Sequence, residues 1–117
     1  MKPKIKRLLM AIDKSGFKDK VIDYTVALAK AMDCNIVIVH VLDKSSIGAV
    51  ADVLGYYRGG KIEPYKEAAK EIAQKLVSEA KAACEGQGLQ AEAQVLSGSS
   101  IADTIISYAK KNDIDLI

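Results

Sequence analysis

The segment Asn35–Asp43 reads NIVIVHVLD and is the clearest strand in the 117-residue chain. Its residues are β-branched almost throughout, and such side chains favour a strand because their restricted rotamers pack well on a pleated surface. The apolar run within it, Ile36–Leu42, is too short to cross a bilayer. We therefore predict a strand over residues 35–43, and we expect no membrane partner.

The residues before this strand predict another strand and a helix. Ile5–Asp13 (IKRLLMAID) is a short apolar run that ends in an acidic residue, which is typical of a strand buried on both faces. Between the two runs, Ser15–Asp33 carries apolar residues at helical spacing, and Ser15 is a natural N-cap. We predict a strand at 5–13 and a helix at 17–33.

A long irregular loop and a long helix follow residue 43. Residues 44–60 contain four glycines among apolar residues. Such a segment is a lid, a contact surface or a connector packed on its own domain. From Ile62 an apolar stripe continues at helical spacing to Cys84, with Pro64 in the first turn and glycines just after the end. We predict a helix over 62–86.

The C-terminal part predicts a strand, a helix and the start of a fourth strand. Residues 90–97 alternate polar and apolar side chains, which indicates an edge or half-exposed strand. Ser100 and Asp103 have capping-box spacing for a helix over 99–111, and Asn112 suits the left-handed C-cap position. Residues 114–117 then begin the fourth strand.

The predicted order β-α-β-α-β-α-β indicates the fold class. Parallel neighbours need crossover connections, and because these connections are right-handed, the helices cover both faces of the sheet. The length suits one core of ordinary size. We predict a single α/β domain over residues 1–117, with 44–60 as a long loop within it.

The charge and the cysteines restrict the partners and the compartment. The net charge is +2, and lysines are interleaved with glutamates, so no face resembles a nucleic-acid interface. Cys34 and Cys84 are isolated and lack metal-type spacing. We interpret both as small buried residues in a reducing environment, and we expect a cytoplasmic protein.

We expect a ligand at the ends of the strands, because open parallel sheets bind ligands at the carboxyl ends of their strands. This directs attention to segments 13–15, 41–43 and 97–99. Asp13 would accept from a ribose hydroxyl, hold a metal or cap the next helix, and its position leaves these roles open. His40 lies between valines, which favours a hydrogen-bonded core residue over a catalytic one.

Several segments, taken in order, resemble the universal stress protein family. They are LLMAID at 8–13, ALAKAMDCNIVIVHVLD at 27–43, the long middle loop, the long amphipathic helix and GSSIADTIISYAKKNDIDLI at 98–117. The resemblance covers nearly the whole chain. It implies a three-layer, flavodoxin-like parallel sheet of the adenine nucleotide alpha hydrolase-like, Rossmann-like type, with strand order 3-2-1-4-5.

The resemblance also implies a nucleotide site. In nucleotide-binding members, the end of the first strand forms one wall, with its aspartate at the ribose and phosphate side. Ala11, Ile12 and Asp13 occupy these positions here. A residue near the end of the second strand meets the adenine edge through its backbone, and Val41 takes that place. The implied ligand is ATP or another adenine nucleotide.

The phosphate-binding loop of the family, G-x-x-G-x9-G-[ST], follows the fourth strand and would therefore fall after Ile117. We expect a domain that is C-terminally truncated, without this loop, the last helix and the fifth strand. On this interpretation, ATP binding depends on residues beyond Ile117.

Two functions remain open from the sequence. The first is a non-enzymatic regulatory domain of the stress response that binds an adenine nucleotide. The second is a stress-protein-like domain that binds no nucleotide and acts through protein–protein contacts. We expect no catalytic residues, because no Ser/Cys–His–acid set can be proposed from the sequence. In addition, DKSGFKD at 13–19 is unlike the SGGxDS loop of an ATP-cleaving enzyme. Family members commonly dimerise, which implies a homodimer.

Overall fold

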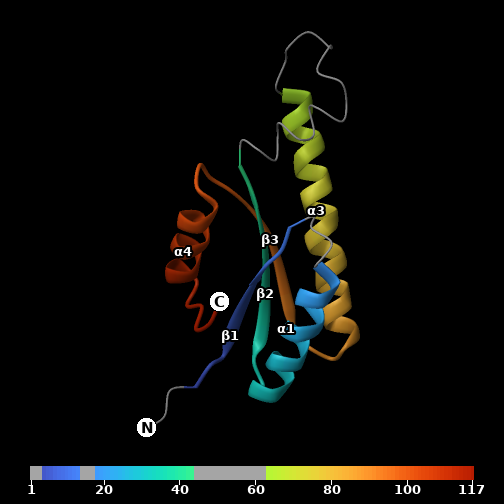
Figure 1. The fold of residues 1–117 in the computed structure, drawn as a ribbon, viewed down its shortest axis with the longest axis vertical. Coiled ribbons are helices and arrows are strands. Elements are labelled where there is room, and N and C mark those ends of the chain that lie inside the picture. The colour runs from blue at the N-terminus through green and yellow to red at the C-terminus, as the bar shows by residue number, and fades with distance from the viewer. Residues whose placement is uncertain (1–3, 14–17, 44–62) are drawn as a thin grey trace.

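The computed structural model of the chain describes residues 4–13, 18–43 and 63–117 (Figure 1). Within these residues the elements follow in the order β1 (Arg7–Ala11), α1 (Lys18–Met32), β2 (Asn35–Leu42), α3 (Glu63–Gly86), β3 (Ala91–Ser97) and α4 (Ile101–Lys111). The predicted alternation of strands and helices is therefore confirmed. The loop predicted at 44–60 and the N-cap predicted at Ser15 lie outside the described residues.

The three strands form a parallel sheet in which β2 lies between β1 and β3. In the first pair Arg7 lies opposite Asn35, and in the second Ile36 lies opposite Ala91. β2 is buried along most of its length, whereas β3 alternates between half-buried and exposed side chains. This difference is the one expected of a central strand and an edge strand.

Helices cover both faces of the sheet. α1 and α3 lie on one face and α4 lies on the other (Figure 1). Alternate residues of β2 supply the two cores: Ile36 and Ile38 pack with α1 and α3, while Val37 and Val39 pack with side chains of α4. The predicted three-layer α/β fold is confirmed.

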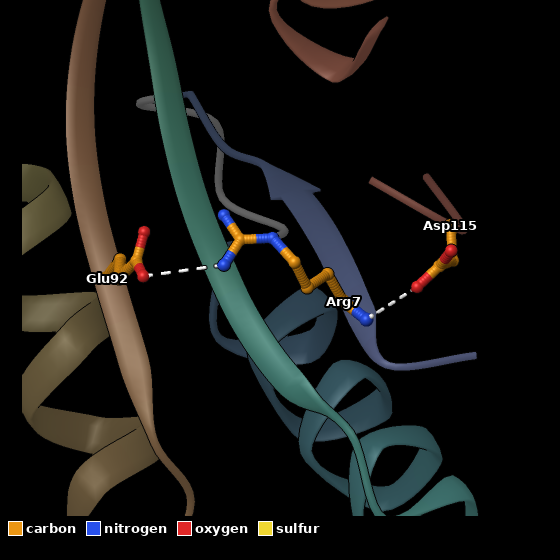
Figure 2. A network of polar contacts seen from close by, with 3 residues as sticks. All are labelled: Arg7, Glu92 and Asp115. Carbon is orange, nitrogen blue, oxygen red and sulfur yellow. Dashed lines mark hydrogen bonds and ion pairs between the residues drawn. The ribbon is translucent and has the colours of Figure 1, made fainter. Parts of the chain in front are cut away.

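Residues near the C-terminus extend the sheet beside β1. Leu116 forms a parallel bridge with Leu8, and the Leu9 N–H donates to the Leu116 carbonyl at 2.8 Å. The Asp115 carboxylate accepts from the backbone N–H of Arg7, whose guanidinium reaches across β2 to Glu92 at 3.5 Å (Figure 2). The predicted fourth strand is thus one bridge beside β1, and the strand order 3-2-1-4 agrees with the prediction.

The ends of α4 confirm one capping prediction and correct another. Ser100 is the N-cap, and its hydroxyl accepts from the Asp103 N–H at 3.3 Å. The prediction of a left-handed Asn112 is wrong, because its φ is −117° and the left-handed residue is Asp113, with φ 55°. The Asn112 N–H still donates to the Tyr108 carbonyl. Directly after the left-handed residue, the Ile114 N–H donates to the Ala109 carbonyl at 3.1 Å.

The buried side chains agree with the interpretation of the cysteines. Cys34 and Cys84 are both free and buried, and burial is the main reason that the pKa of each thiol is raised. Among the helices that the structure describes, none has the length and apolar character needed to cross a membrane.

Candidate functional site

A cavity of about 420 Å³ lies at the carboxyl ends of β1 and β2. Its lining combines strand ends with residues of α1 and α4, and consists of Ala11, Ile12, Asp13, Lys18, Val21, His40, Val41, Asp43, Ile101 and Ile105. The cavity therefore occupies the place where open parallel sheets bind ligands.

The four residues predicted for a nucleotide site all line this one cavity. Ala11 and Asp13 are exposed, whereas Ile12 and Val41 are buried with 7% and 5% of their surface accessible. The exposed pair therefore forms a solvent-accessible rim of the cavity, and the buried pair forms an apolar wall. The structure therefore brings the predicted residues together.

The β1–β2 register explains why these residues meet. Ala11 lies opposite Val39, and the Ile12 N–H donates to the Val39 carbonyl at 3.0 Å, so the pairing continues one residue past the end of β1. Asp13 and Val41 are each two residues beyond the Ala11–Val39 pair. Both therefore lie at the same edge of the sheet.

His40 is a cavity residue whose contact the sequence did not reveal. As predicted, the side chain is a hydrogen-bonded core residue, with 7% of its surface exposed. Its Nδ1 lies 2.8 Å from the Ile12 carbonyl oxygen. Since a carbonyl oxygen only accepts, Nδ1 carries the proton. The one feature of the sequence that indicated a place at the cavity was that His40 directly precedes the predicted site residue Val41.

The charged groups around the cavity come from three elements or their ends. Asp13 follows β1, Asp43 follows β2 and Lys18 begins α1. The Lys18 ammonium also lies 3.7 Å from the Glu79 carboxylate of α3. Lys18 and the α4 residues Ile101 and Ile105 were missed from the sequence, since only the folded arrangement of the helices shows which of their residues face a strand end.

The third strand end, segment 97–99, lines a different groove. Ser97, Gly98 and Ser99 border a hydroxyl-rich groove along α4 rather than the cavity. Gly98 packs so closely on α4 that a Cβ there would clash with the Thr104 hydroxyl. Residues from two of the three strand-end segments, 13–15 and 41–43, therefore line the cavity, whereas segment 97–99 does not. Among the residues that the structure describes, no group of three His, Cys, Asp or Glu side chains could hold a metal ion.

The sequence model of the universal stress protein family matches residues 4–117. No curated protein matches the chain. Among solved structures, a universal stress protein family member from Burkholderia pseudomallei matches with a TM-score of 0.77 and 18% identity, covering 95% of this chain and 78% of that one.

Two further solved structures resemble the chain. A universal stress protein from Archaeoglobus fulgidus has a TM-score of 0.66 and 17% identity, covering 98% of this chain and 75% of that one. A universal stress protein in complex with cAMP has a TM-score of 0.61 and 14% identity, covering 97% of this chain and 71% of that one. At these identities the likeness establishes a shared fold.

Proposed function

Because this chain belongs to the universal stress protein family, whose sequence model matches residues 4–117, we propose that it is a non-enzymatic regulatory domain that binds an adenine nucleotide. The binding site in this proposal is the cavity at the ends of β1 and β2. The observation that carries the proposal is that Ala11, Ile12, Asp13 and Val41 all line that cavity.

The size and lining of the cavity support a small-molecule ligand. A volume of about 420 Å³ lies within the usual range of small-molecule pockets, roughly 300–1,000 Å³. Ile12 and Val41 give an apolar wall against which a purine ring would pack, and the rim carries the Asp13 carboxylate. A solved member of the same fold is a complex with cAMP, which is itself an adenine nucleotide.

In this proposal different residues contact different parts of the ligand. The Asp13 carboxylate accepts hydrogen bonds from the ribose hydroxyls, and the backbone of Val41 meets the adenine edge. The described residues therefore supply the adenosine contacts. ATP remains a candidate alongside cAMP, because both present the same adenosine group.

The test is isothermal titration calorimetry of the chain with ATP and with cAMP, repeated for Asp13→Ala. A hydrogen bond to a charged group is worth about 1.5–3 kcal/mol, so Asp13→Ala should weaken binding by about 10- to 100-fold. The matched control is Asp23→Ala, which removes an exposed carboxylate of α1 that does not line the cavity.

Two results would contradict the proposal. If neither nucleotide binds, the cavity is no nucleotide site. If binding survives Asp13→Ala while stability falls by about 1 kcal/mol, Asp13 acts as a helix cap instead. Release of inorganic phosphate from ATP, measured in the same samples, would contradict the non-enzymatic part.

A specific observation favours protein contacts as a second candidate function. Val21, Tyr24 and Leu28 project from α1 with 39%, 70% and 42% of their surface exposed, and Ile117 nearby is 61% exposed. We propose that a second copy of the chain covers this stripe in a homodimer. Tyr24→Ser with Leu28→Ser should then lower the mass found by light scattering, and an unchanged mass would argue against it.

The cytoplasmic location also remains a proposal. Its support is the pair of free thiols, Cys34 and Cys84, which persist most readily in a reducing compartment. Fractionation of cells with an antibody against the chain would test it, and recovery from an oxidising compartment would contradict it.

A further inference from the structure

The hydrogen bonds between β1 and β2 follow the regular parallel pattern until the edge of the cavity. The Asn35 N–H donates to the Lys6 carbonyl at 2.9 Å, so the odd-numbered residues of β2 direct their N–H groups toward β1. The Ile12 N–H donates to the Val39 carbonyl at 3.0 Å. In a regular ladder, the next bond would run from the Val41 N–H to the Ile12 carbonyl.

The imidazole of His40 replaces that bond. Among the backbone bonds between described residues outside the regular elements, none joins Val41 to Ile12. The Ile12 carbonyl instead accepts from the protonated Nδ1 of His40 at 2.8 Å. His40 is 7% exposed, so water has little access to compete for this bond. The ring thus takes the carbonyl out of the ladder at the residue directly before Asp13.

We infer that His40 is a positioning residue of the cavity. By binding the Ile12 carbonyl, it holds the peptide that leads into Asp13 and releases the Val41 N–H from the β1–β2 ladder. Val41 lines the cavity, so the released N–H is a donor for a ligand. His40 itself acts through Ile12 and Val41 and need not touch the ligand.

The chemistry of a backbone donor defines the ligand atom that would meet it. An N–H group requires an acceptor, and the ring nitrogens of adenine are acceptors that lie in the plane of the base. His40 would therefore make the cavity selective for a planar heterocycle that presents a ring-nitrogen acceptor. This step rests on the function proposed above and assigns a role to a residue outside the four predicted ones.

The binding test uses two substitutions of His40 that differ in one property. His40→Leu removes the donor and keeps a buried apolar side chain, so the Ile12 carbonyl returns to the Val41 N–H. His40→Asn keeps an N–H donor near the position of Nδ1. We expect His40→Leu to weaken cAMP and ATP binding about three- to tenfold, the value of one neutral hydrogen bond. His40→Asn should restore most of the affinity.

A control separates positioning from stability. Ile38→Val shortens a fully buried residue of the same strand that does not line the cavity. It should lower the melting temperature and leave affinity unchanged. If His40→Leu binds as tightly as the wild-type chain, or if Ile38→Val weakens binding equally, the positioning role is wrong while the nucleotide site stands.

A second measurement needs no ligand, so it remains decisive if no nucleotide binds. In a ¹⁵N-labelled chain, the long-range ¹H–¹⁵N spectrum of His40 should give the tautomer protonated at Nδ1. The Val41 amide hydrogen should exchange about tenfold faster than that of Val39, and His40→Leu should abolish the difference. A proton on Nε2, or equal protection of the two amides in the wild-type chain, would overturn the inference.

Discussion

The carboxylate of Asp115 accepts a hydrogen bond from the backbone N–H of Arg7 at 3.0 Å, at the start of β1 (Figure 2). The same carboxylate oxygen accepts from the Lys6 N–H at 2.8 Å. These bonds, the one from Lys6 first, lower the pKa of Asp115 from its ordinary value of 3.8. This exposed side chain therefore joins the backbone bond between Leu9 and Leu116 in holding the C-terminal segment to the edge of the sheet, and its charged form is the better acceptor.

The first prediction concerns the pH dependence of stability. Because the folded pKa of Asp115 is lowered, its contribution is complete above the unfolded pKa of 3.8 and is lost as the pH falls through the folded value. Asp115→Ala should lower the melting temperature at pH 7, and the difference from the wild-type chain should shrink near pH 3. Calorimetry at both pH values measures this, with Asp23→Ala as the control for removing a carboxylate. A difference that persists at low pH would contradict it.

The second prediction concerns the turn between β3 and α4. Gly98→Ala places a methyl group against the Thr104 hydroxyl, and the Thr104 Cβ would lie 3.2 Å away. Thr104 yields little, because its hydroxyl donates to the Ser100 carbonyl at 2.6 Å. We expect a loss of about 1–3 kcal/mol in urea unfolding. Gly86→Ala is the matched control, since a Cβ there meets nothing within 4 Å.

Combining Gly98→Ala with Thr104→Ala tests the cause. If the clash is responsible, removing the Thr104 side chain makes the double variant more stable than the sum of the single changes requires. Strictly additive losses would place the cost elsewhere in the turn.

The third prediction concerns the two thiols. Cys34 and Cys84 are 4% and 0% exposed, and burial raises the pKa of both. The thiolate is the reactive form, so both should resist alkylation by iodoacetamide at pH 8 in the folded chain. Both should react in urea, and mass spectrometry of tryptic peptides would measure each. Rapid labelling of Cys84 without denaturant would indicate that α3 separates from the sheet.

The fourth prediction ranks the adenine ligands. The charged groups that the structure places around the cavity are Asp13, Asp43 and Lys18, and Lys18 also meets Glu79 at 3.7 Å. This lining favours the adenosine part over the phosphates. Adenosine, AMP and ATP should therefore bind with dissociation constants within about tenfold of one another. Tight ATP binding with weak adenosine binding would require phosphate contacts outside this lining.

The sequence predicted β2 to within one residue, because β-branched residues fill it and acidic or amide residues bound it. β1 spans Arg7–Ala11, two residues shorter at each end than the predicted 5–13. The apolar pattern indicates burial, which continues to Ile12. It does not indicate where the regular hydrogen bonding between the strands ends. The left-handed residue after α4 was predicted at Asn112 and is found at its neighbour Asp113. The sequence does not distinguish these positions, because both Asn and Asp tolerate the left-handed conformation.

Some residues of the candidate site could likewise be predicted from the sequence, and others could not. Ala11, Ile12, Asp13 and Val41 could be assigned because strand ends meet at one edge of a parallel sheet. The role of His40 could not, because it depends on a contact with a residue 28 positions away and on which of two donors takes one carbonyl. Periodicity carries no information on such a choice.

The parallel pairing of the sheet has a consequence for the speed of folding. Each described strand pairs with a partner distant in the sequence, and the bond between Lys6 and Asp115 joins residues 109 positions apart. Chain closure over such distances precedes any gain from the contacts, so folding is slower than for a helical bundle of this length. We expect the Lys6–Asp115 contact to form late in folding, because it joins residues 109 positions apart, and its loss should then mainly accelerate unfolding. On this view Asp115 contributes more to the lifetime of the native state than to the rate at which that state forms.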